Sequence, residues 1–279
     1  MIENINWYPG HMKKTRELIQ ENLKLVDIAV EVLDARIPVS SRNPSIDDIL
    51  GNKKRVVVLN KSDLSDHTEN VKWVEAMGRS GQTAIPMNCM AGTGTPNFLK
   101  LLNALLAEKN SGKARKKPLR LMIVGVPNAG KSSLINRLTG KKSAKTGDRP
   151  GITRGKQWLN LDEGVQLLDT PGILWPKFED RRTGLYLAFC GSIKDEILDR
   201  ETLALELITV LQSRYPKLLM ERYKIDEIFE SPINNMESIA VKRGFLLPGK
   251  RIDYDRAART LLDEFRAGKI GRITLEPFE

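Results

Sequence analysis

The chain has 279 residues, of which 41% are hydrophobic, and its formal net charge at pH 7 is +10. This length favours about two domains with buried cores. No run of about 18 apolar residues occurs, and no apolar stretch is visible in the first residues, so we expect neither a membrane span nor a secretory signal. The two cysteines, Cys89 and Cys190, are too few for a disulfide framework or a four-cysteine zinc site. We therefore expect a cytoplasmic protein with no membrane partner.

The first 124 residues alternate between strands and helices. After a Pro-Gly turn within Trp7–Met12 and a short helical pattern, the apolar runs predict strands at 26–33, 55–59, 83–87 and 119–124. The 3.6-residue periodicity predicts helices at 45–50, 68–78 and 95–108. Strands that alternate with helices indicate a doubly wound, mostly parallel sheet.

The second half begins with a polar loop at 140–156, followed by a pair of strands at 157–161 and 165–168. Beyond residue 177 the strand pattern ends, and helices are expected at 184–193, 195–213 and 254–267. We therefore expect an α/β domain over 1–178 and an all-α domain over 179–279.

The positive charge is concentrated in one stretch. Residues 109–156 hold 14 Lys and Arg residues but one acidic residue, Asp148, whereas 177–279 hold 18 basic and 18 acidic residues. A polyanion such as nucleic acid is the natural partner of such a stretch. The alternative is a solvated linker together with lysines that serve a bound nucleotide.

The segment Gly125–Ser133, here called the phosphate loop, has the full spacing G-x-x-x-x-G-K-S between a strand and a helix. Its backbone N–H groups would surround phosphate oxygens, and the helix N-terminus adds a favourable dipole. Lys131 would reach the β- and γ-phosphates, and the Ser132 hydroxyl would bind Mg²⁺. The alternative is a chance glycine turn before an ordinary helix. The residues expected to contact nucleotide here are Asn128, Ala129, Gly130, Lys131, Ser132 and Ser133.

The segment Asn60–Asp63, here called the base loop, has the sequence Asn-Lys-Ser-Asp at the end of a predicted strand. Guanine presents two N–H donors on one edge, and the carboxylate of Asp63 is suited to accept both. Asn60 would address O6 and N7 of the base, and Lys61 would lie along its plane. The sequence therefore predicts a guanine site, with a chance polar turn as the alternative.

Two further segments complete a GTP site. Asp169–Gly172 reads Asp-Thr-Pro-Gly after a predicted strand, so Asp169 would hold Mg²⁺ through water and the Gly172 N–H would sense the γ-phosphate. Pro150–Thr153 carries the Thr153 hydroxyl, which would complete the Mg²⁺ shell when GTP is bound. Each segment alone is a weak signal, but the four together indicate a GTPase.

The order of the motifs is unusual because the base loop precedes the phosphate loop. A circular permutation explains this order without changing the sheet. The sequence resembles the circularly permuted GTPases of the YlqF type over nearly its whole length. The resemblance rests on Trp7–Met12, Asp34–Pro38, Ser40–Pro44, Asn60–Asp63, Gly125–Ser133, Pro150–Arg154, Asp169–Gly172 and Glu264–Gly271. It implies a bacterial GTPase that binds ribosomal RNA and acts in late assembly of the large ribosomal subunit.

The resemblance also implies roles for particular residues. Ile173 stands where many GTPases carry a water-orienting glutamine, and His11 is the substitute that this family suggests. Asn128 is similar to the asparagine that binds K⁺ in potassium-stimulated GTPases. Asn88–Gly92 departs from the usual Ser-Ala start of its element, so the contact with guanine O6 near Asn88 and Cys89 would come from backbone N–H groups. Lys131, Thr153 and His11 are then the expected catalytic residues.

The partners follow from the same reasoning: GTP and GDP, a precursor of the large subunit, and its rRNA, with the protein itself monomeric. One alternative is a GTP-gated RNA-binding module in which hydrolysis is incidental. Another alternative is a small-subunit factor among other permuted GTPases, which carry an N-terminal oligonucleotide-binding barrel or a zinc site. This alternative fits less well, because 25 residues before the first strand are too few for the barrel and two cysteines cannot build the zinc site. We also expect the basic stretch 109–156 to surround the phosphate loop, so that bound rRNA lies near the arm that carries His11.

Overall fold

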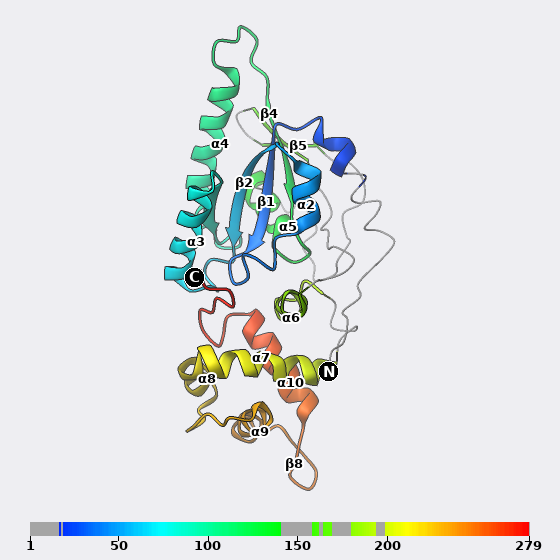
Figure 1. Cartoon of the computed structure of the whole chain (residues 1–279), viewed down its shortest axis with the longest axis vertical. Coiled ribbons are helices and arrows are strands. Elements are labelled where there is room, and N and C mark those ends of the chain that lie inside the picture. The colour runs from blue at the N-terminus through cyan, green and yellow to red at the C-terminus, as the bar shows by residue number, and fades with distance from the viewer. Residues whose placement is uncertain are drawn as a thin grey trace. The chain divides into compact units, whose positions relative to one another are not determined.

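The computed structural model describes residues 17, 19–140, 158–161, 164–168, 180–193 and 199–278. The described residues form two compact units (Figure 1). The unit here called the α/β unit holds residues 17–168 together with 276–278, and the helical unit holds residues 180–275. No helix in the described part of the chain combines the length and apolarity that crossing a membrane requires.

A single sheet forms the centre of the α/β unit. Within the described residues its strands are β1 (Ile28–Asp34), β2 (Lys54–Asn60), β3 (Thr83–Met87), β4 (Leu119–Val124), β5 (Trp158–Leu161) and β6 (Val165–Leu168). The strand order is β3-β2-β1-β4-β6-β5, and every neighbouring pair is parallel except the antiparallel pair β5 and β6. The predicted doubly wound, mostly parallel sheet is confirmed.

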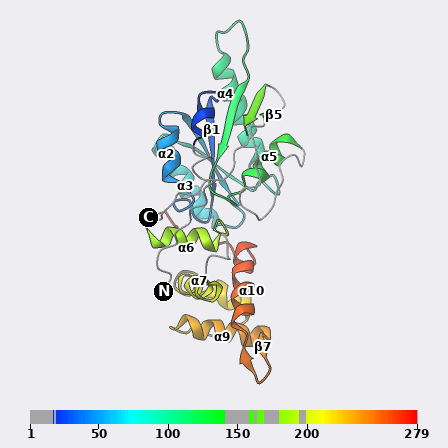
Figure 2. The same ribbon diagram turned by 90° about the vertical axis from the view of Figure 1, so that its right-hand side faces the viewer.

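Helices cover both faces of this sheet (Figure 2). They are α2 (Pro44–Leu50), α3 (His67–Arg79), α4 (Thr95–Asn110) and α5 (Lys131–Thr139). α2 and α3 pack on one face, where Ala29 and Leu33 of β1 contribute to two apolar clusters. α4 and α5 lie on the other face. Because both faces are covered, β1 is buried along its whole length, as its apolar sequence predicts.

The strand register brings the carboxyl ends of three strands to one edge of the sheet. Asp34, the last residue of β1, pairs with Asn60 of β2, which in turn pairs with Met87 of β3. The strand order reverses between β1 and β4, and such a point in an open α/β sheet is where ligands bind. The base loop, the phosphate loop and Asn88–Gly92 therefore start from the same edge.

The helical unit consists of α6 (Arg181–Phe189), α7 (Arg200–Arg214), α8 (Pro216–Tyr223), α9 (Pro232–Arg243) and α10 (Tyr254–Arg266), with a two-residue hairpin of β7 (Leu246–Leu247) and β8 (Arg251–Ile252). Aspartates cap three of these helices: Asp180, Asp199 and Asp253 each accept from a backbone N–H of the first turn. α7 packs on α9 and α10 through a buried stripe that includes Leu203, Leu207 and Leu211. The prediction of helices here was incomplete, because it did not include α8, α9 or the hairpin.

The last residues of the chain do not belong to the helical unit. Glu276–Phe278 pack on the α/β unit, whereas the sequence pattern predicts one domain over 179–279. The reason is a set of specific contacts that these residues make with the loop after β1 and with α3.

Candidate functional site

The phosphate loop joins β4 to α5 and depends on backbone conformations that favour glycine. Gly125 has a φ of 148°, and a Cβ there would lie 2.4 Å from the carbonyl oxygen of Val32 in β1. Asn128 adopts a φ of 58°, a left-handed conformation that asparagine tolerates better than most residues. The buried Lys131 donates from Nζ to the carbonyl oxygen of Val126 at 2.8 Å, so its ammonium group lies against the loop that it is expected to serve.

Gly130 of the phosphate loop immediately precedes α5 and lies against the side chain of Asn60. Its φ is 103°, and a Cβ at this position would lie 1.9 Å from Asn60 Nδ2. No L-residue fits there without displacing Asn60. The second glycine of the motif is therefore required by a long-range contact as well as by the turn itself.

Asn60 connects three loops. Its Nδ2 donates to the carbonyl oxygen of Ala129 in the phosphate loop at 2.7 Å, and its Oδ1 accepts from the N–H of Cys89 at 3.1 Å. The side chain is buried. The contact of Asn60 with O6 and N7 of guanine stays a prediction, and the structure shows that the amide group of this side chain links the loops to one another.

The base loop turns immediately after β2. Lys61 has a φ of 59°, and the N–H of Ser62 donates to the carbonyl oxygen of Met87 at 3.1 Å, which ties the loop to β3. Asn70 of α3 donates to the carbonyl oxygen of Ser62 at 3.1 Å. The side chain of Asp63 is exposed at the end of this supported turn, so its carboxylate is available to a ligand.

Lys61 also belongs to a buried ionic cluster. Arg36 binds Asp34 through two parallel hydrogen bonds of 2.9 and 2.8 Å, and Lys61 Nζ lies 2.8 Å from the same carboxylate. Burial alone would raise the pKa of Asp34, but the charges of Arg36 and Lys61 hold it well below its usual range. The carboxylate therefore stays ionised. Lys61 was expected to lie along the base plane, and here its ammonium group binds Asp34.

The loop Asn88–Gly92 is held by its own side chain and by α5. Asn88 Oδ1 accepts from the N–H groups of Met90 and Ala91 at 3.0 and 2.9 Å. Arg137 of α5 donates to the carbonyl oxygen of Cys89 at 3.0 Å and to that of Met90. Sequence reasoning missed Arg137, which joins the helix after the phosphate loop to the loop beside the base. The predicted O6 contact stays a prediction, because the Cys89 N–H binds Asn60 here.

The thiol of Cys89 is buried between these loops. Burial raises its pKa to about 12, although the nearby charge of Arg137 acts in the opposite direction. The side chain therefore fills space as a neutral group, and it is the backbone of Cys89 that makes the polar contacts.

Several predicted site residues lie outside the described part of the chain. They are His11, Thr153, Asp169, Gly172 and Ile173. β6 ends at Leu168, which pairs with Met122 of β4, so the segment that starts at Asp169 follows the strand next to β4 in the sheet.

The donor set at the phosphate loop fits Mg²⁺. In the described ranges no group of three or more His, Cys, Asp or Glu side chains is placed to hold a metal ion. The partly exposed hydroxyl of Ser132, in the first turn of α5, is the described group that the motif assigns to the ion. Mg²⁺ typically keeps several waters and is bound by one or two protein groups plus substrate phosphates. A sparse set of oxygen ligands at this position is therefore appropriate.

The expectation that the basic stretch 109–156 surrounds the phosphate loop is wrong for its described first part. The exposed residues 111–117 precede β4, whereas the phosphate loop follows it. A six-residue strand spans roughly 20 Å. Figure 1 shows this connection between α4 and β4 at the opposite end of the sheet from the nucleotide loops. Its Lys and Arg residues therefore form a separate basic surface.

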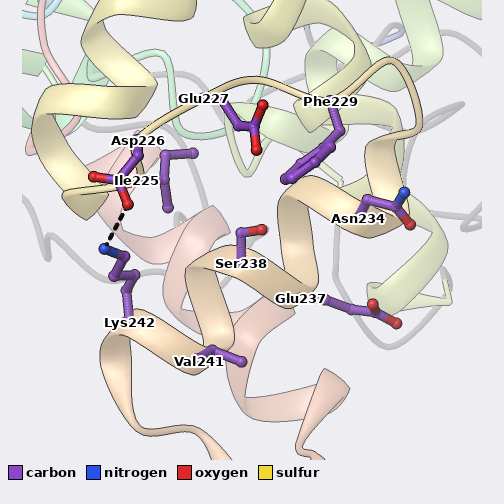
Figure 3. A pocket seen from close by; sticks show the side chains of 9 residues that line it. All are labelled: Ile225, Asp226, Glu227, Phe229, Asn234, Glu237, Ser238, Val241 and Lys242. Atoms are coloured by element: carbon purple, nitrogen blue, oxygen red, sulfur yellow. Dashed lines mark hydrogen bonds and ion pairs between the residues drawn. The ribbon is translucent and has the colours of Figure 1, made fainter.

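The helical unit contains a cavity of about 490 Å³, shown in Figure 3. It lies between the segment after α8 and the side of α9, and Asp226 and Lys242 form an ion pair of 2.9 Å at its rim. It has neither a glycine-rich turn nor one of the nucleotide motifs. The nucleotide site is therefore assigned to the loops of the α/β unit rather than to this cavity.

Comparison with known proteins gives consistent matches. Residues 120–232 match the family described as 50S ribosome-binding GTPase. The chain is 45% identical to ribosome biogenesis GTPase A of Bacillus cereus over 98% of this chain and 93% of the relative. It is 47% identical to the protein of that name from Priestia megaterium, over 98% of this chain and 96% of the relative. GNP-bound YlqF from T. maritima matches with a TM-score of 0.65 and 30% identity, over 95% of this chain and 98% of that one.

The fold and the loops define a P-loop GTPase in which the base loop precedes the phosphate loop in sequence. The chain is therefore an enzyme that hydrolyses GTP. It belongs to the family of ribosome biogenesis GTPase A, the circularly permuted GTPases of the YlqF type, and the resemblance seen in the sequence is confirmed.

Proposed function

We propose that this GTPase acts in late maturation of the bacterial large ribosomal subunit, binds rRNA of the subunit precursor, and hydrolyses GTP faster on that particle. The matched family is described as 50S ribosome-binding, and the relatives are named ribosome biogenesis GTPase A. An exposed basic surface at 111–117 on a chain of charge +10 supports an RNA partner. The protein works in the cytoplasm as a monomer.

The observation that carries the nucleotide part of this proposal is the bridge made by Asn60. Its 2.7 Å bond to Ala129 ties the phosphate loop to the strand from which the base loop starts. One nucleotide would then bind Asp63 through guanine, and Lys131 and the N–H groups of the phosphate loop through its phosphates. Asn128, Gly130 and Ser133 of the phosphate loop would also contact the nucleotide.

The remaining assignments concern the γ-phosphate. Bound Mg²⁺ would supply charge neutralisation at the β- and γ-phosphates. Ser132, Thr153 and Asp169 would hold the ion, and the Gly172 N–H would bind the γ-phosphate. Asn128 would bind K⁺ as an activating cation near the phosphates.

His11 is proposed to orient the attacking water. The side chain of Ile173 has no polar atom that could orient a water, and a positioned acid–base group typically contributes ~10²–10⁴-fold to a rate. In this proposal the ribosomal particle orders the segment that carries His11, so that hydrolysis follows docking. His11→Ala would then keep GTP affinity and particle binding but lose most particle-stimulated turnover.

The decisive experiment measures GTP hydrolysis and co-sedimentation with purified large-subunit precursors, mature subunits or no particles. We expect binding to precursors with a non-hydrolysable GTP analogue, weaker binding with GDP, and hydrolysis stimulated by particles. Lys131→Ala should abolish nucleotide binding, whereas Lys100→Ala, an exposed lysine on α4, should behave as wild type. Equal hydrolysis with and without every particle would contradict the proposal.

The alternative of a GTP-gated RNA-binding module predicts another outcome. A variant that binds GTP without hydrolysing it would still support subunit assembly in cells. If turnover is required, such cells accumulate precursor particles.

A further inference from the structure

The C-terminal tail Glu276–Phe278 binds the loop that follows β1. The carboxylate of Glu276 accepts from the backbone N–H of Val39 at 2.7 Å and from that of Ser40 at 3.0 Å, and it also accepts from the Ser40 hydroxyl. Two successive backbone N–H groups that converge on one carboxylate form a small anion-binding nest. The contact joins residues more than 230 positions apart in sequence.

The end of the tail is anchored on α3 by independent contacts. Trp73 donates from Nε1 to the carbonyl oxygen of Glu276 at 2.8 Å, and its ring meets that of Phe278 edge to face, with 5.2 Å between the centroids. The N–H of Phe278 donates to Glu69 at 2.7 Å, and the guanidinium of Arg79 lies 5.8 Å from the centre of the Phe278 ring. The tail thus has a polar contact at one end and an aromatic contact at the other.

The loop bound by Glu276 is connected to the base loop through buried groups. Ser41, next to Ser40, accepts from the N–H of Asp34 at 3.1 Å and donates to the carbonyl oxygen of Ile37 at 2.7 Å. The carboxylate of Asp34 in turn holds Lys61 at 2.8 Å. A continuous set of short contacts therefore runs from the tail to the residue two positions before Asp63.

We propose that Glu276 is a positioning residue for guanine recognition: by holding Val39 and Ser40, the C-terminal tail keeps Asp34 and Lys61, and hence the base loop, in the conformation that binds the nucleotide. This inference rests on the proposed role of Asp63 at the guanine base. It assigns a function in nucleotide binding to the last residues of the chain, beyond the nucleotide motifs themselves.

Thermodynamic linkage makes this proposal quantitative. If the docked tail raises the affinity for GDP by some factor, bound GDP must favour tail docking by the same factor. Nucleotide affinity and tail docking are thus two readouts of one coupling. A tail that only stabilised the fold would show no such relation.

The experiment uses the full chain with Glu276→Ala and Phe278→Ala, which disrupt the two ends of the tail separately. We expect each variant to bind GDP about 3–10-fold more weakly in titrations. The preference for GDP over IDP, which lacks the 2-amino group, should narrow because Asp63 is less well placed. Glu108→Gln, which removes an exposed carboxylate paired with Lys54, is the matched control and should leave both values unchanged.

Hydrogen exchange supplies the reciprocal measurement. In the wild type, saturating GDP should slow hydrogen exchange of the Val39 and Ser40 amides. The factor of this slowing should equal the factor by which Glu276→Ala weakens GDP binding. That dependence on GDP should disappear in Glu276→Ala.

Wild-type GDP affinity in both tail variants would overturn the inference, even if their melting temperatures fall, since the tail would then only stabilise the fold. An equal loss of affinity in Glu108→Gln would also overturn it, because surface charge would explain the effect. Failure of the wild type to prefer guanine nucleotides would instead refute the proposed role of Asp63.

Discussion

The two units of the molecule use charged side chains in different ways. In the α/β unit, Asp34 and Arg36 are each 1% exposed and lie at the edge of the sheet from which the nucleotide loops start. In the helical unit, Glu264 binds Arg222 and Arg243, whose side chains are 30% and 32% exposed. Asp34 and Arg36 are removed from water, with only Lys61 of their cluster partly exposed, whereas both arginines of the second cluster reach water.

This difference shows what each cluster contributes. Removing two charges from water costs free energy, and this cost offsets much of the attraction between them. A buried ion pair is therefore weak evidence for stability. The Asp34 cluster instead fixes the direction of Lys61 and the base loop. The helical unit has apolar stripes on α7 and α10, and the arginines that bind the buried Glu264 lie at its margin.

The largest expected effect comes from breaking the buried cluster. Asp34→Ala should lower the free energy of unfolding of the α/β unit by about 3–5 kcal/mol, because Arg36 remains buried without its carboxylate. Glu264→Ala should cost the helical unit only about 1–2 kcal/mol, since its arginine partners can be hydrated.

Urea unfolding separates the two units in this experiment. Residues 180–275 contain no tryptophan, whereas Trp73 and Trp158 lie in the α/β unit, so tryptophan fluorescence reports the unfolding of that unit, while far-ultraviolet circular dichroism also detects the helical unit. Equal losses in the two variants would remove the contrast between the clusters.

The second effect tests the contact between Gly130 and Asn60. Gly130→Ala should lower the free energy of unfolding by about 2–4 kcal/mol. The loss comes from the strain of an alanine in a left-handed conformation and from the hydrogen bonds that Asn60 loses when it is displaced. Gly81→Ala is the matched control, because Gly81 also has a positive φ, 79°, but a Cβ there would meet no described atom within 4 Å. It should cost only about 1–2 kcal/mol of strain. Comparable losses in both variants would mean that Asn60 moves without cost.

The third effect concerns specificity rather than stability. Asp63→Asn replaces one acceptor oxygen with a donor amide, so affinity should move from guanine toward xanthine nucleotides by about 1–3 kcal/mol. The dissociation constants for GDP and XDP measure this shift. Asp48→Asn, at an exposed site on α2, should bind both nucleotides as the wild type does. A variant at Asp63 that kept the wild-type preference would refute the base assignment.

The smallest effect is a dependence on pH. The pKa of Asp34 is lower in the folded protein than in the unfolded chain, so its contribution is fully present above the unfolded pKa and declines as the pH falls toward the folded value. The pKa of an aspartate in the unfolded chain is about 3.9. Relative to its value at neutral pH, the difference in free energy of unfolding between wild type and Asp34→Asn should therefore shrink by only about 0.3 kcal/mol at pH 4 and about 1.3 kcal/mol at pH 3. A decline already complete between pH 7 and 5 would contradict a lowered pKa. Denaturant unfolding of both proteins at a series of pH values measures this stability difference.

The sequence was informative where a local pattern reports local structure. Apolar runs and the residues after them located the strand ends and the loops that begin at Asn60, Asn88 and Gly125. The helices α8 and α9 were not predicted, although each begins with a proline, Pro216 or Pro232, which is common in the first turn of a helix. Both prolines are therefore local signals for the start of these helices.

Other features depend on contacts that no local pattern encodes. Arg137 reaches a loop 48 residues earlier, and Glu276 reaches Ser40 across 236 residues. The bridging role of Asn60 also required the fold, because its partners Ala129 and Cys89 lie on two different loops. The sequence predicted which loops form the site, whereas the contacts between the loops came from the structure.

The permuted order of the strands has a consequence for the nascent chain. β1, β2 and β3 are synthesised first, and β4, which covers the open edge of β1, arrives later. At roughly 5–20 residues per second, about 4–14 s separate the synthesis of Asn60 from that of Lys131. During that interval the emerging sheet has an unpaired apolar edge, a known hazard for aggregation, and it has no phosphate loop with which to bind GTP. Nucleotide can therefore stabilise this protein only after the chain has been translated past Lys131, which is nearly half of its 279 residues.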